Sequence, residues 1–454
     1  MKRDENLNRR EALKLLGMGS GLLFGSGASS SENKVLLSRP ASHKKARIVI
    51  AGGGTAGMIA AARARRAAPN AQIVLICPNE THLYQSGQLF VAAGLEREEK
   101  YMRKTADLVP DDVTWIREKV ISFDPDRNSL QTQKSGKVVY DLLIVALGAE
   151  YDYGAIDGLS SDMIGKEGIA SLYLNDTIKG TARGGSASYG LFSKMMQDAK
   201  TAKTPLKVLF TEPASAIKGE GTSLSLLLLY KSFLEKEFAD KNVHFTFAKA
   251  GRTLLPSVPF DKVLKKELKK HKNIDTVYDH DLVKIDPAKK TASFKKEGDH
   301  IEMEYDYIHI VPPLRAPEVV RKSLLSVQEG AQKGWMQIDE KRLRHKKYRN
   351  VFGIGDVTDL LNAKSGAAAQ HQGIILQDNI AAALEGEALE YFYDGYTACA
   401  VVTSYGKALL AEYNEKKPLA TFMLDPYEPR MLWWWLQRYF MPWAYFNLLM
   451  RGMM

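Results

Sequence analysis

The chain has 454 residues, 45% of them hydrophobic and 26% charged, and a formal net charge of +10. This length is sufficient for two or more domains with sizeable buried cores. The chain contains only two cysteines, which excludes a disulfide scaffold and a four-cysteine zinc or iron–sulfur site, and we expect no metal site. Lysine-rich runs such as Lys262–Lys272 supply much of the charge without any nucleic-acid-binding motif. We therefore interpret them as solvated helix faces and expect no nucleic-acid partner.

Residues 1–30 have the pattern of a twin-arginine export signal. Arg9 and Arg10 are adjacent, a mild apolar run extends from Leu15 to Phe24, and small residues follow it. The pattern predicts export and a location at the periplasmic, outer face of the cytoplasmic membrane. A disordered basic arm is the alternative interpretation. Residues 31–45 are polar and are predicted to be a linker.

The next segment has the pattern of a dinucleotide-binding unit. Apolar runs at Arg47–Ala51 and Gln72–Ile76 predict two buried parallel strands, with a helix over Ala60–Ala68 between them. A G-x-G-x-x-G turn precedes the helix, where free N–H groups and the helix dipole attract a pyrophosphate. The residues predicted to bind the cofactor in this turn are Gly52, Gly54, Ala56 and Gly57.

The second strand departs from this pattern at its end. An Asp or Glu usually stands there and binds a ribose hydroxyl. Cys77 occupies the position in this chain, and Glu80 follows three residues later as a candidate substitute. We expect Cys77 to be a structural residue beside the adenosine half of the cofactor, without a redox role.

Two later segments predict that the cofactor is FAD. Val138–Tyr151 contains a strand and a glycine turn at Gly148, and the segment at 350–380 ends a strand in Gly355 and Asp356. In flavoproteins with two dinucleotide-binding domains, such a carboxylate accepts hydrogen bonds from the ribityl chain. The dipole of the following helix and Lys364 would stabilise negative charge on the reduced flavin. Alternatively, Asp356 is the N-cap of that helix.

The middle of the chain is predicted to be a second Rossmann-like domain without a nucleotide. A strand is expected at Lys207–Phe210 and a helix at Leu224–Phe238, but the turn between them lacks G-x-G-x-x-G, so we expect no NAD(P)H site. The predicted fold class is therefore α/β with two Rossmann-like domains. Residues 46–155 and 315–395 are assigned to the FAD-binding domain, and residues 156–314 to the second.

Residues 396–454 are predicted to cap the flavin and to associate with a membrane. Three consecutive tryptophans occur at 433–435, and arginines and Pro442 interrupt the apolar run, so a spanning helix is excluded. We expect two short amphipathic helices in the membrane interface. Three consecutive tryptophans point all around a helix, so one buried face cannot hide them. The alternative is a helix pair packed on the chain's own core or on a second subunit.

From about Arg47 to its C-terminus, the chain resembles the sulfide:quinone oxidoreductases and the flavocytochrome c sulfide dehydrogenase flavoproteins. The resemblance implies a redox cysteine pair beside the flavin, a small reduced donor such as sulfide, and membrane quinone as electron acceptor. Besides the glycine motif and Lys364, it rests on the segments THLYQSGQLFVAAG (81–94), FTEPASAIKGEG (210–221), IHIVPPLRAPEVV (308–320), VFGIGDVTDL (351–360), YDGYTACAVVTSYGKALLAEY (393–413) and WAYFNLLMRG (443–452).

One of the two redox cysteines of that family is missing. The resemblance places Cys399 at one position, as the catalytic residue, whereas Gly219 stands at the other. Cys77 is expected at the adenosine end, too far away for a disulfide, which needs Cα atoms within about 7 Å. Three functions stay open: catalysis by Cys399 alone, a quinone- or cytochrome-linked flavoprotein with another donor, and a degenerate flavin-binding subunit of an exported complex. A homo-oligomer or a cytochrome subunit stays open as partner. Glu220 is either a proton acceptor or an exposed loop acid, and we expect the latter.

Overall fold

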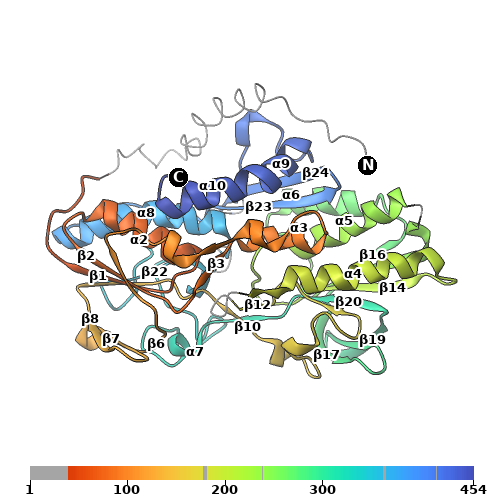
Figure 1. Cartoon of the computed structure of the whole chain (residues 1–454), viewed down its shortest axis with the longest axis horizontal. Helices are drawn as coiled ribbons and strands as arrows, with labels where there is room; N and C mark the ends of the chain where they lie inside the picture. Colours follow the sequence, from red (N-terminus) through yellow and green to blue (C-terminus); the bar gives the residue numbers. More distant parts are fainter. Residues whose placement is uncertain (1–38, 177–180, 238, 361–363, 416) are drawn as a thin grey trace.

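The computed structural model describes residues 39–176, 181–237, 239–360, 364–415 and 417–454. The predicted export signal lies outside these residues, as does the predicted linker up to residue 38. Two parallel sheets lie side by side along the long axis of the molecule, and the C-terminal elements lie across the top in Figure 1. The predicted fold class, α/β with two Rossmann-like units, is confirmed.

The first sheet is parallel, and its strands are continuous apolar runs because both faces are covered. Its order is β22 (Val351–Gly353), β9 (Leu142–Val145), β1 (Arg47–Ala51), β2 (Gln72–Ile76) and β5 (Val113–Ile116). The two strands predicted from the apolar runs, β1 and β2, are confirmed. Helix α2 (Thr55–Ala67) begins directly at the glycine turn, earlier than predicted, and packs on α8 (Gly366–Glu385).

The second sheet is also parallel and carries helices α4 (Arg183–Thr201), α5 (Thr222–Lys236) and α6 (Val258–Leu268). Its order is β11 (Ile169–Ala170), β20 (Tyr307–Ile310), β14 (Leu206–Glu212), β15 (Val243–Lys249) and β16 (Ile274–Tyr278). The predicted strand lies within β14. The predicted helix is α5, which ends two residues earlier than expected, at Lys236.

Smaller elements complete the two units and connect them. Strands β10 (Glu150–Tyr151) and β21 (Leu314–Arg315) pair antiparallel where the chain crosses between the sheets, and α3 (Gln88–Ala92) packs on α4 and α5. The other strands are β3 (Thr81–Leu83) with β4 (Met102–Lys104), β6 (Val120–Asp124) with β7 (Ser129–Thr132) and β8 (Gly136–Val139), β12 (Asn175–Asp176) with β13 (Thr181–Ala182), and β17 (Asp281–Asp286) with β18 (Thr291–Lys296) and β19 (Asp299–Glu304). Helix α7 (Glu318–Arg321) is short, and 3-10 turns lie at 85–87, 98–101, 105–107, 125–127, 153–155, 161–163, 240–242, 355–357, 421–423 and 449–451.

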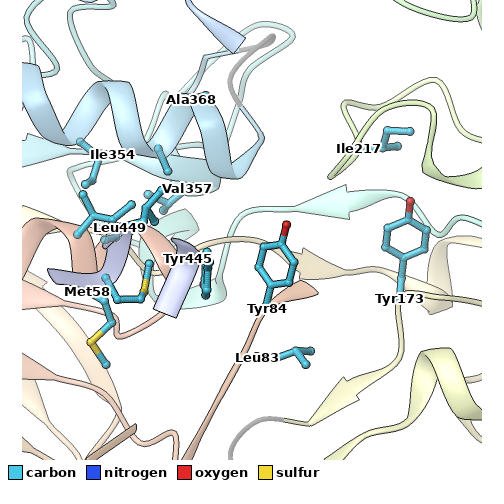
Figure 2. Close-up of a cluster of buried hydrophobic side chains, with 14 of the residues drawn as sticks. Met58, Leu83, Tyr84, Tyr173, Ile217, Ile354, Val357, Ala368, Tyr445 and Leu449 are labelled. Atoms are coloured by element: carbon cyan, nitrogen blue, oxygen red, sulfur yellow. The ribbon is translucent and has the colours of Figure 1, made fainter. Parts of the chain in front are cut away.

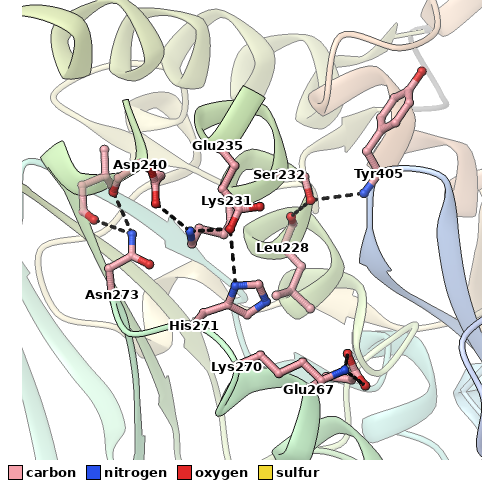
Figure 3. Close-up of polar contacts among 11 residues, drawn as sticks. Leu228, Lys231, Ser232, Glu235, Asp240, Glu267, Lys270, His271, Asn273 and Tyr405 are labelled. Atoms are coloured by element: carbon pink, nitrogen blue, oxygen red, sulfur yellow. Dashed lines mark hydrogen bonds and ion pairs between the residues drawn. The ribbon is translucent and has the colours of Figure 1, made fainter. Parts of the chain in front are cut away.

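After α8 the chain forms a hairpin that docks on the second unit. Strands β23 (Thr397–Ser404) and β24 (Lys407–Asn414) are antiparallel, and β23 packs on α5. The short strand β25 (Lys417–Pro418) pairs antiparallel with the end of β24. The Tyr405 N–H at the hairpin tip donates to Ser232 Oγ on α5 at 3.2 Å (Figure 3). On the same helix, the buried Lys231 ammonium pairs with Glu235 at 2.7 Å and with Asp240 at 3.1 Å.

The C-terminal stretch is one helical run rather than two helices divided at Pro442. It comprises α9 (Met431–Trp435), a π-helical segment (Leu436–Phe440) and α10 (Met441–Asn447). Pro442 lies in the first turn of α10, directly after the π segment. Proline has no N–H to donate, and a wider local turn accommodates it without ending the helix. Among the described residues, the structure has no helix that is both long enough and apolar enough to cross a bilayer.

The consecutive tryptophans are more buried than expected. Trp433 and Trp434 are both buried, whereas Trp435 is half-buried. Trp434 meets the edge of Phe90, with ring centroids 5.5 Å apart, and Trp433 stacks on Phe422 at 5.9 Å. As predicted, one buried face does not hide all three tryptophans. Trp433 and Trp434 are nevertheless both covered, because other parts of the chain pack on α9 from two sides.

Candidate functional site

The glycine turn after β1 combines close packing with open space. Gly52 has φ +111°, and a Cβ there would lie 2.3 Å from the carbonyl oxygen of Ala146. A Cβ on Gly57 would lie 1.8 Å from the Gly52 carbonyl oxygen. Both positions therefore require glycine for α2 to start against the sheet. A Cβ on Gly54 would meet no described atom within 4 Å, which leaves room for a ligand at the N-terminus of α2.

Cys77 directly follows β2 and fills the space beside this turn. Its Sγ lies 2.3 Å from where a Cβ of Gly53 would be, and it accepts from the Asn79 N–H at 3.4 Å. Burial raises the pKa of this thiol to about 11, so the thiol is neutral. Both cysteines are free, and the geometry agrees with a structural role for Cys77. Glu80, the suggested ribose-binding substitute, is exposed.

The turn that follows β22 contacts helix α2. Gly355 has φ +74°, and a Cβ there would lie 2.7 Å from the Cβ of the half-buried Ala56. The Gly355 N–H donates to Gln372 Oε1 at 2.7 Å. Glycine therefore lets the turn after β22 approach α2, and the structure brings Gly355 and the first glycine turn together.

Asp356 does not cap the following helix, so that alternative is wrong. The N-cap of α8 is Ser365, whose Oγ accepts from the Ala368 N–H at 3.0 Å. The half-buried Asp356 carboxylate instead lies 3.4 Å from the Lys218 ammonium. The alternative failed because a serine nearer the helix satisfies its free N–H groups.

Two lysines surround Asp356. Lys218 Nζ also donates to the Ala149 carbonyl at 3.3 Å and lies over the Tyr151 ring, so it joins the second unit to the first. Lys364 Nζ donates to the carbonyl oxygen of Asp356 at 2.7 Å. Burial lowers the pKa of Lys364 to about 8, so the ammonium stays mostly charged at neutral pH. The turn at Gly148, with φ +69°, leads toward this cluster, and a Cβ there would meet no described atom within 4 Å.

Cys399 lies on β23 and faces the loop between β14 and α5. Its half-buried thiol donates to the Glu220 carbonyl oxygen. Burial, followed by the carboxylates of Glu220 and Glu212, raises the pKa of this thiol. Gly219, at the position of the missing cysteine, has φ +62°, and of the described atoms only those of Thr222 lie within 4 Å of a Cβ built there. Cys399 is therefore beside the loop, as the resemblance implies, and none of its atoms lies within 4 Å of a Cβ built at position 219.

Glu220 is not an exposed loop acid, contrary to our expectation. It is half-buried, and its carboxylate accepts from the Tyr413 hydroxyl on β24 at 3.5 Å. The pKa of Glu220 is raised to about 7, chiefly by burial; Lys249 opposes this rise and Glu212 contributes to it. The loop is covered because the hairpin folds back over it, which no local sequence pattern indicates.

A second group that the sequence did not predict links the C-terminal helix to the glycine turn. Tyr445 Oη lies 2.6 Å from Thr55 Oγ1 in α2 and 2.6 Å from His82 Nε2. Burial lowers the pKa of His82 to about 4, so the imidazole is neutral. Figure 2 shows Tyr445 between Met58 and Tyr84, in a cluster that draws on both sheets and the C-terminus. The partners are more than 350 residues apart in the chain, so only the fold brings them together.

These features fit a flavin dinucleotide. The N-terminus of α2 with the open space at Gly54 suits a pyrophosphate. At the other end, Lys218 and Lys364 place positive charge around Asp356, which suits a ring system that becomes negative on reduction. Cys399 lies on the adjoining hairpin, next to the loop that carries Lys218. The first sheet, the loop and the hairpin therefore supply one continuous site.

Comparisons with known proteins agree with this arrangement. A family model for pyridine nucleotide-disulphide oxidoreductases matches residues 46–176. The mitochondrial sulfide:quinone oxidoreductase of Mus musculus is 30% identical over 409 residues, which is 89% of this chain and 86% of that protein. The sulfide-quinone reductase of Aquifex aeolicus (strain VF5) is 27% identical over 68% of each chain.

Two solved structures share the fold. The sulfide:quinone oxidoreductase from Aquifex aeolicus superposes with a TM-score of 0.69 at 20% identity and covers 88% of this chain and 91% of that one. A chain in the mitochondrial ATP synthase of Tetrahymena thermophila gives a TM-score of 0.75 at 16% identity and covers 93% of this chain and 99% of that one. At these identities, both likenesses concern the fold alone.

Proposed function

The chain belongs to the sulfide:quinone oxidoreductase family, and from this premise we propose that it oxidises its sulfur donor with a single thiol, Cys399. As a member of that family it is an FAD-dependent oxidoreductase of the sulfide:quinone type. The proposal extends to export by the twin-arginine route and to attachment at the outer face of the cytoplasmic membrane.

The observation that carries the single-thiol proposal is the geometry of the loop at 217–221. The Cys399 thiol contacts the main chain of Glu220, and Lys218 of the same loop contacts Asp356. Of the two cysteines, the other one, Cys77, is buried at the end of β2 in the first sheet. No described atom of Cys399 lies within 4 Å of a Cβ built at position 219. These contacts support a site that uses one thiol rather than a dithiol.

The lysines of the site hold positive charge where reduction adds negative charge. FAD, when bound, supplies the two-electron acceptor. Burial opposes the charge of Lys218, but Tyr151 and Asp356 raise its pKa overall, so this ammonium is charged at neutral pH. Lys364 is held by the carbonyl oxygens of Asp356 and Thr358. These residues would stabilise negative charge on bound FAD when it is reduced, without themselves changing covalently.

The Glu220 carboxylate lies close enough to the Cys399 thiol to raise the pKa of that thiol, and we propose it as the acceptor of the thiol proton. A thiolate, not a thiol, is the nucleophile in sulfur chemistry. Transfer of the thiol proton to the Glu220 carboxylate gives a thiolate and a carboxylic acid, with no change in total charge. Because the pKa of Glu220 is raised to about 7, the carboxylate and the acid are both populated near neutral pH. Tyr413 holds the carboxylate from β24.

An aromatic stripe on the C-terminal helical run supports the proposed membrane attachment. The stripe consists of Met431, Trp435, Tyr439 and Trp443, spaced four residues apart. Met431 is 65% exposed, Tyr439 41% and Trp443 51%, whereas Trp435 is half-buried. Of the residues between the stripe members, Trp433, Trp434 and Pro442 are buried. Tryptophan and tyrosine favour the headgroup region, and a helix lying in the interface needs one apolar face. The export proposal rests on the Arg9–Arg10 pattern alone.

Anaerobic bleaching of the bound flavin tests the single-thiol proposal. We expect sulfide to bleach the wild-type flavin and the Cys77→Ala control, and a soluble quinone analogue to restore the colour. Cys399→Ala should bleach at least about 100-fold more slowly, since the nucleophile is lost. Equal bleaching rates in Cys399→Ala would refute the role of Cys399. A flavin that sulfide leaves unbleached in the wild type would favour a degenerate subunit.

Liposome flotation tests the proposed attachment. The double substitution Met431→Glu and Trp443→Glu places charges on the stripe without touching the buried tryptophans. We expect this variant to stay in the soluble fraction while the wild type floats. Val139→Glu, on a 49% exposed residue of β8, is the matched control and should float. Flotation of the stripe variant with the liposomes would argue against the stripe as the contact.

A further inference from the structure

A chain of three hydrogen bonds joins the C-terminal helical run to the glycine turn of the first unit. Tyr445 Oη of α10 lies 2.6 Å from Oγ1 of Thr55, the first residue of α2, and 2.6 Å from His82 Nε2 of β3. His82 Nδ1 lies 3.3 Å from the carbonyl oxygen of Gly53. The chain therefore holds the turn on both sides of Gly54, the position where a Cβ would meet no described atom within 4 Å.

The hydrogen bonds of this chain run in one direction. A carbonyl oxygen only accepts, so Nδ1 of His82 carries the hydrogen that the Gly53 oxygen receives. Burial lowers the pKa of His82 to about 4, so the ring is neutral and its Nε2 can only accept. The Tyr445 hydroxyl therefore donates to Nε2, and the Thr55 hydroxyl donates to Tyr445 Oη. With a neutral imidazole, no other arrangement satisfies all three contacts.

Contacts other than the hydroxyl already fix the position of Tyr445. Its side chain is 4% exposed, and its ring packs against Tyr84 with centroids 4.6 Å apart and meets the edge of Phe446 at 5.0 Å. At the end of the chain, the Arg63 guanidinium of α2 donates to the carbonyl oxygen of Met454. The C-terminal run is therefore held against the first unit on both sides of the hydroxyl.

The sequence of the turn leaves its conformation to outside contacts. Residues 52–54 are three consecutive glycines, and glycine accepts more backbone conformations than any other residue. Ordering a mobile segment on binding lowers the affinity for its ligand. A buried hydrogen-bond chain whose members are all satisfied keeps them in one arrangement. Holding the turn at Gly53 and Thr55 therefore favours binding of a pyrophosphate at the start of α2.

We propose that Tyr445 is a positioning residue for FAD, which holds the glycine turn ready for the pyrophosphate through His82 and Thr55. The turn and the start of α2 supply the binding groups, and Tyr445 acts through them. The C-terminal helical run therefore has a role in retaining the cofactor besides the membrane contact proposed for its exposed stripe. The inference rests on the FAD-dependent function of the chain and is independent of the role proposed for Cys399.

Release of FAD from the loaded, full-length protein tests this role. Tyr445→Phe keeps the ring and removes only the hydroxyl. After dilution, the fluorescence of free flavin should appear about tenfold faster than in the wild type. Tyr101→Phe is the matched control, because the Tyr101 ring lies 6.0 Å from that of Tyr84 and its buried hydroxyl has no hydrogen-bond partner among the described residues. This control should release FAD at the wild-type rate.

Hydrogen exchange at saturating FAD is the second readout, and it separates positioning from a general loss of stability. In Tyr445→Phe the amides of residues 53–57 should exchange faster, whereas those of β1 and β2 should keep their wild-type rates. A merely structural role would speed exchange across the whole first sheet. That result, or release of FAD from Tyr445→Phe at the wild-type rate, would overturn the proposal.

A second variant decides the question if Tyr445→Phe does not fold. Thr55→Val removes the bond between the half-buried Thr55 and Tyr445 and leaves the bond to His82 in place. It should release FAD faster and speed exchange of the same amides, and wild-type behaviour in both measurements would refute the positioning role alone. A wild type that retained no FAD would overturn the flavoprotein function together with this proposal. No sulfide is used, so the outcome does not depend on the single-thiol proposal.

Discussion

Restoring a cysteine at position 219 is expected not to restore a dithiol. Disulfides join Cβ atoms about 3.5–4.5 Å apart, most often near 3.8 Å. In Gly219→Cys the new Cβ has only Thr222 atoms within 4 Å among the described residues, with Thr222 Oγ1 at 2.9 Å. The thiol of Cys399 points instead to the Glu220 carbonyl. Bridging would require at least that the Cys399 thiol leave this carbonyl.

The substitution should also destabilise the protein. Gly219 has φ +62°, a left-handed conformation that costs a residue with a Cβ about 1–2 kcal/mol. The close approach to Thr222 Oγ1 adds to this cost, although a hydroxyl at the end of a short side chain can shift. We therefore expect the free energy of unfolding, measured by denaturant titration, to fall by about 1–2 kcal/mol in Gly219→Cys.

Gly219→Ala is the matched control, because it introduces the same backbone strain without a thiol. Peptide mapping of the oxidised protein should find the thiols of residues 219 and 399 free in Gly219→Cys. Denaturant titration should give similar losses for the two variants. A bridge between residues 219 and 399, with a stability above that of Gly219→Ala, would refute the claim that this loop has left the dithiol geometry.

Three further predictions concern the same site. Tyr445→Phe removes the hydroxyl that bonds Thr55 and His82, and it leaves the buried imidazole without this partner. The free energy of unfolding, measured by denaturant titration, should therefore be about 1–3 kcal/mol lower. Lys364→Met removes a buried charge beside Asp356, and potentiometry should find a flavin midpoint potential lower by roughly 30 mV, or about 1.4 kcal/mol for two electrons. The folded-state pKa of Glu220 is about 7 and its ordinary value is 4.5, so the folded state binds this proton more tightly. The free energy of unfolding, measured by denaturant titration, should therefore fall as the pH rises from 4.5 to about 7. This fall should be absent in Glu220→Gln.

Local patterns predicted the first dinucleotide-binding unit well. The strands at Arg47–Ala51 and Gln72–Ile76 were found as predicted, because a short apolar run between turn residues specifies a buried strand by itself. The start of α2 was placed too late, since the helix begins within the glycine turn. Gly57, predicted to bind the cofactor, packs closely against the carbonyl of Gly52.

Features that depend on distant parts of the chain were missed or misjudged. Glu220 was expected to be an exposed loop acid, but Tyr413, almost 200 residues later, contacts its carboxylate. Lys218 stood in the sequence analysis only as part of the segment at 210–221, and nothing local indicates that it reaches Asp356. The neighbourhood of Cys399 and the loop followed from the family resemblance, not from any periodicity in the sequence.

The packing of α5 gives the second unit a structural role although the turn before this helix has no nucleotide motif. In a nucleotide-binding unit the first turn of this helix points its N–H groups at a pyrophosphate. Here a Cβ on Gly221, the N-cap of α5, would lie 2.6 Å from Val401 of β23, and Ser225 of the first turn accepts from the Val402 N–H at 2.9 Å. The strand that carries Cys399 therefore occupies the helix terminus that a nucleotide would need. Strand β23 and a nucleotide cannot both occupy this helix terminus. The second unit therefore positions the thiol, which supports the expectation that it holds no NAD(P)H site and that NADH will not reduce the flavin.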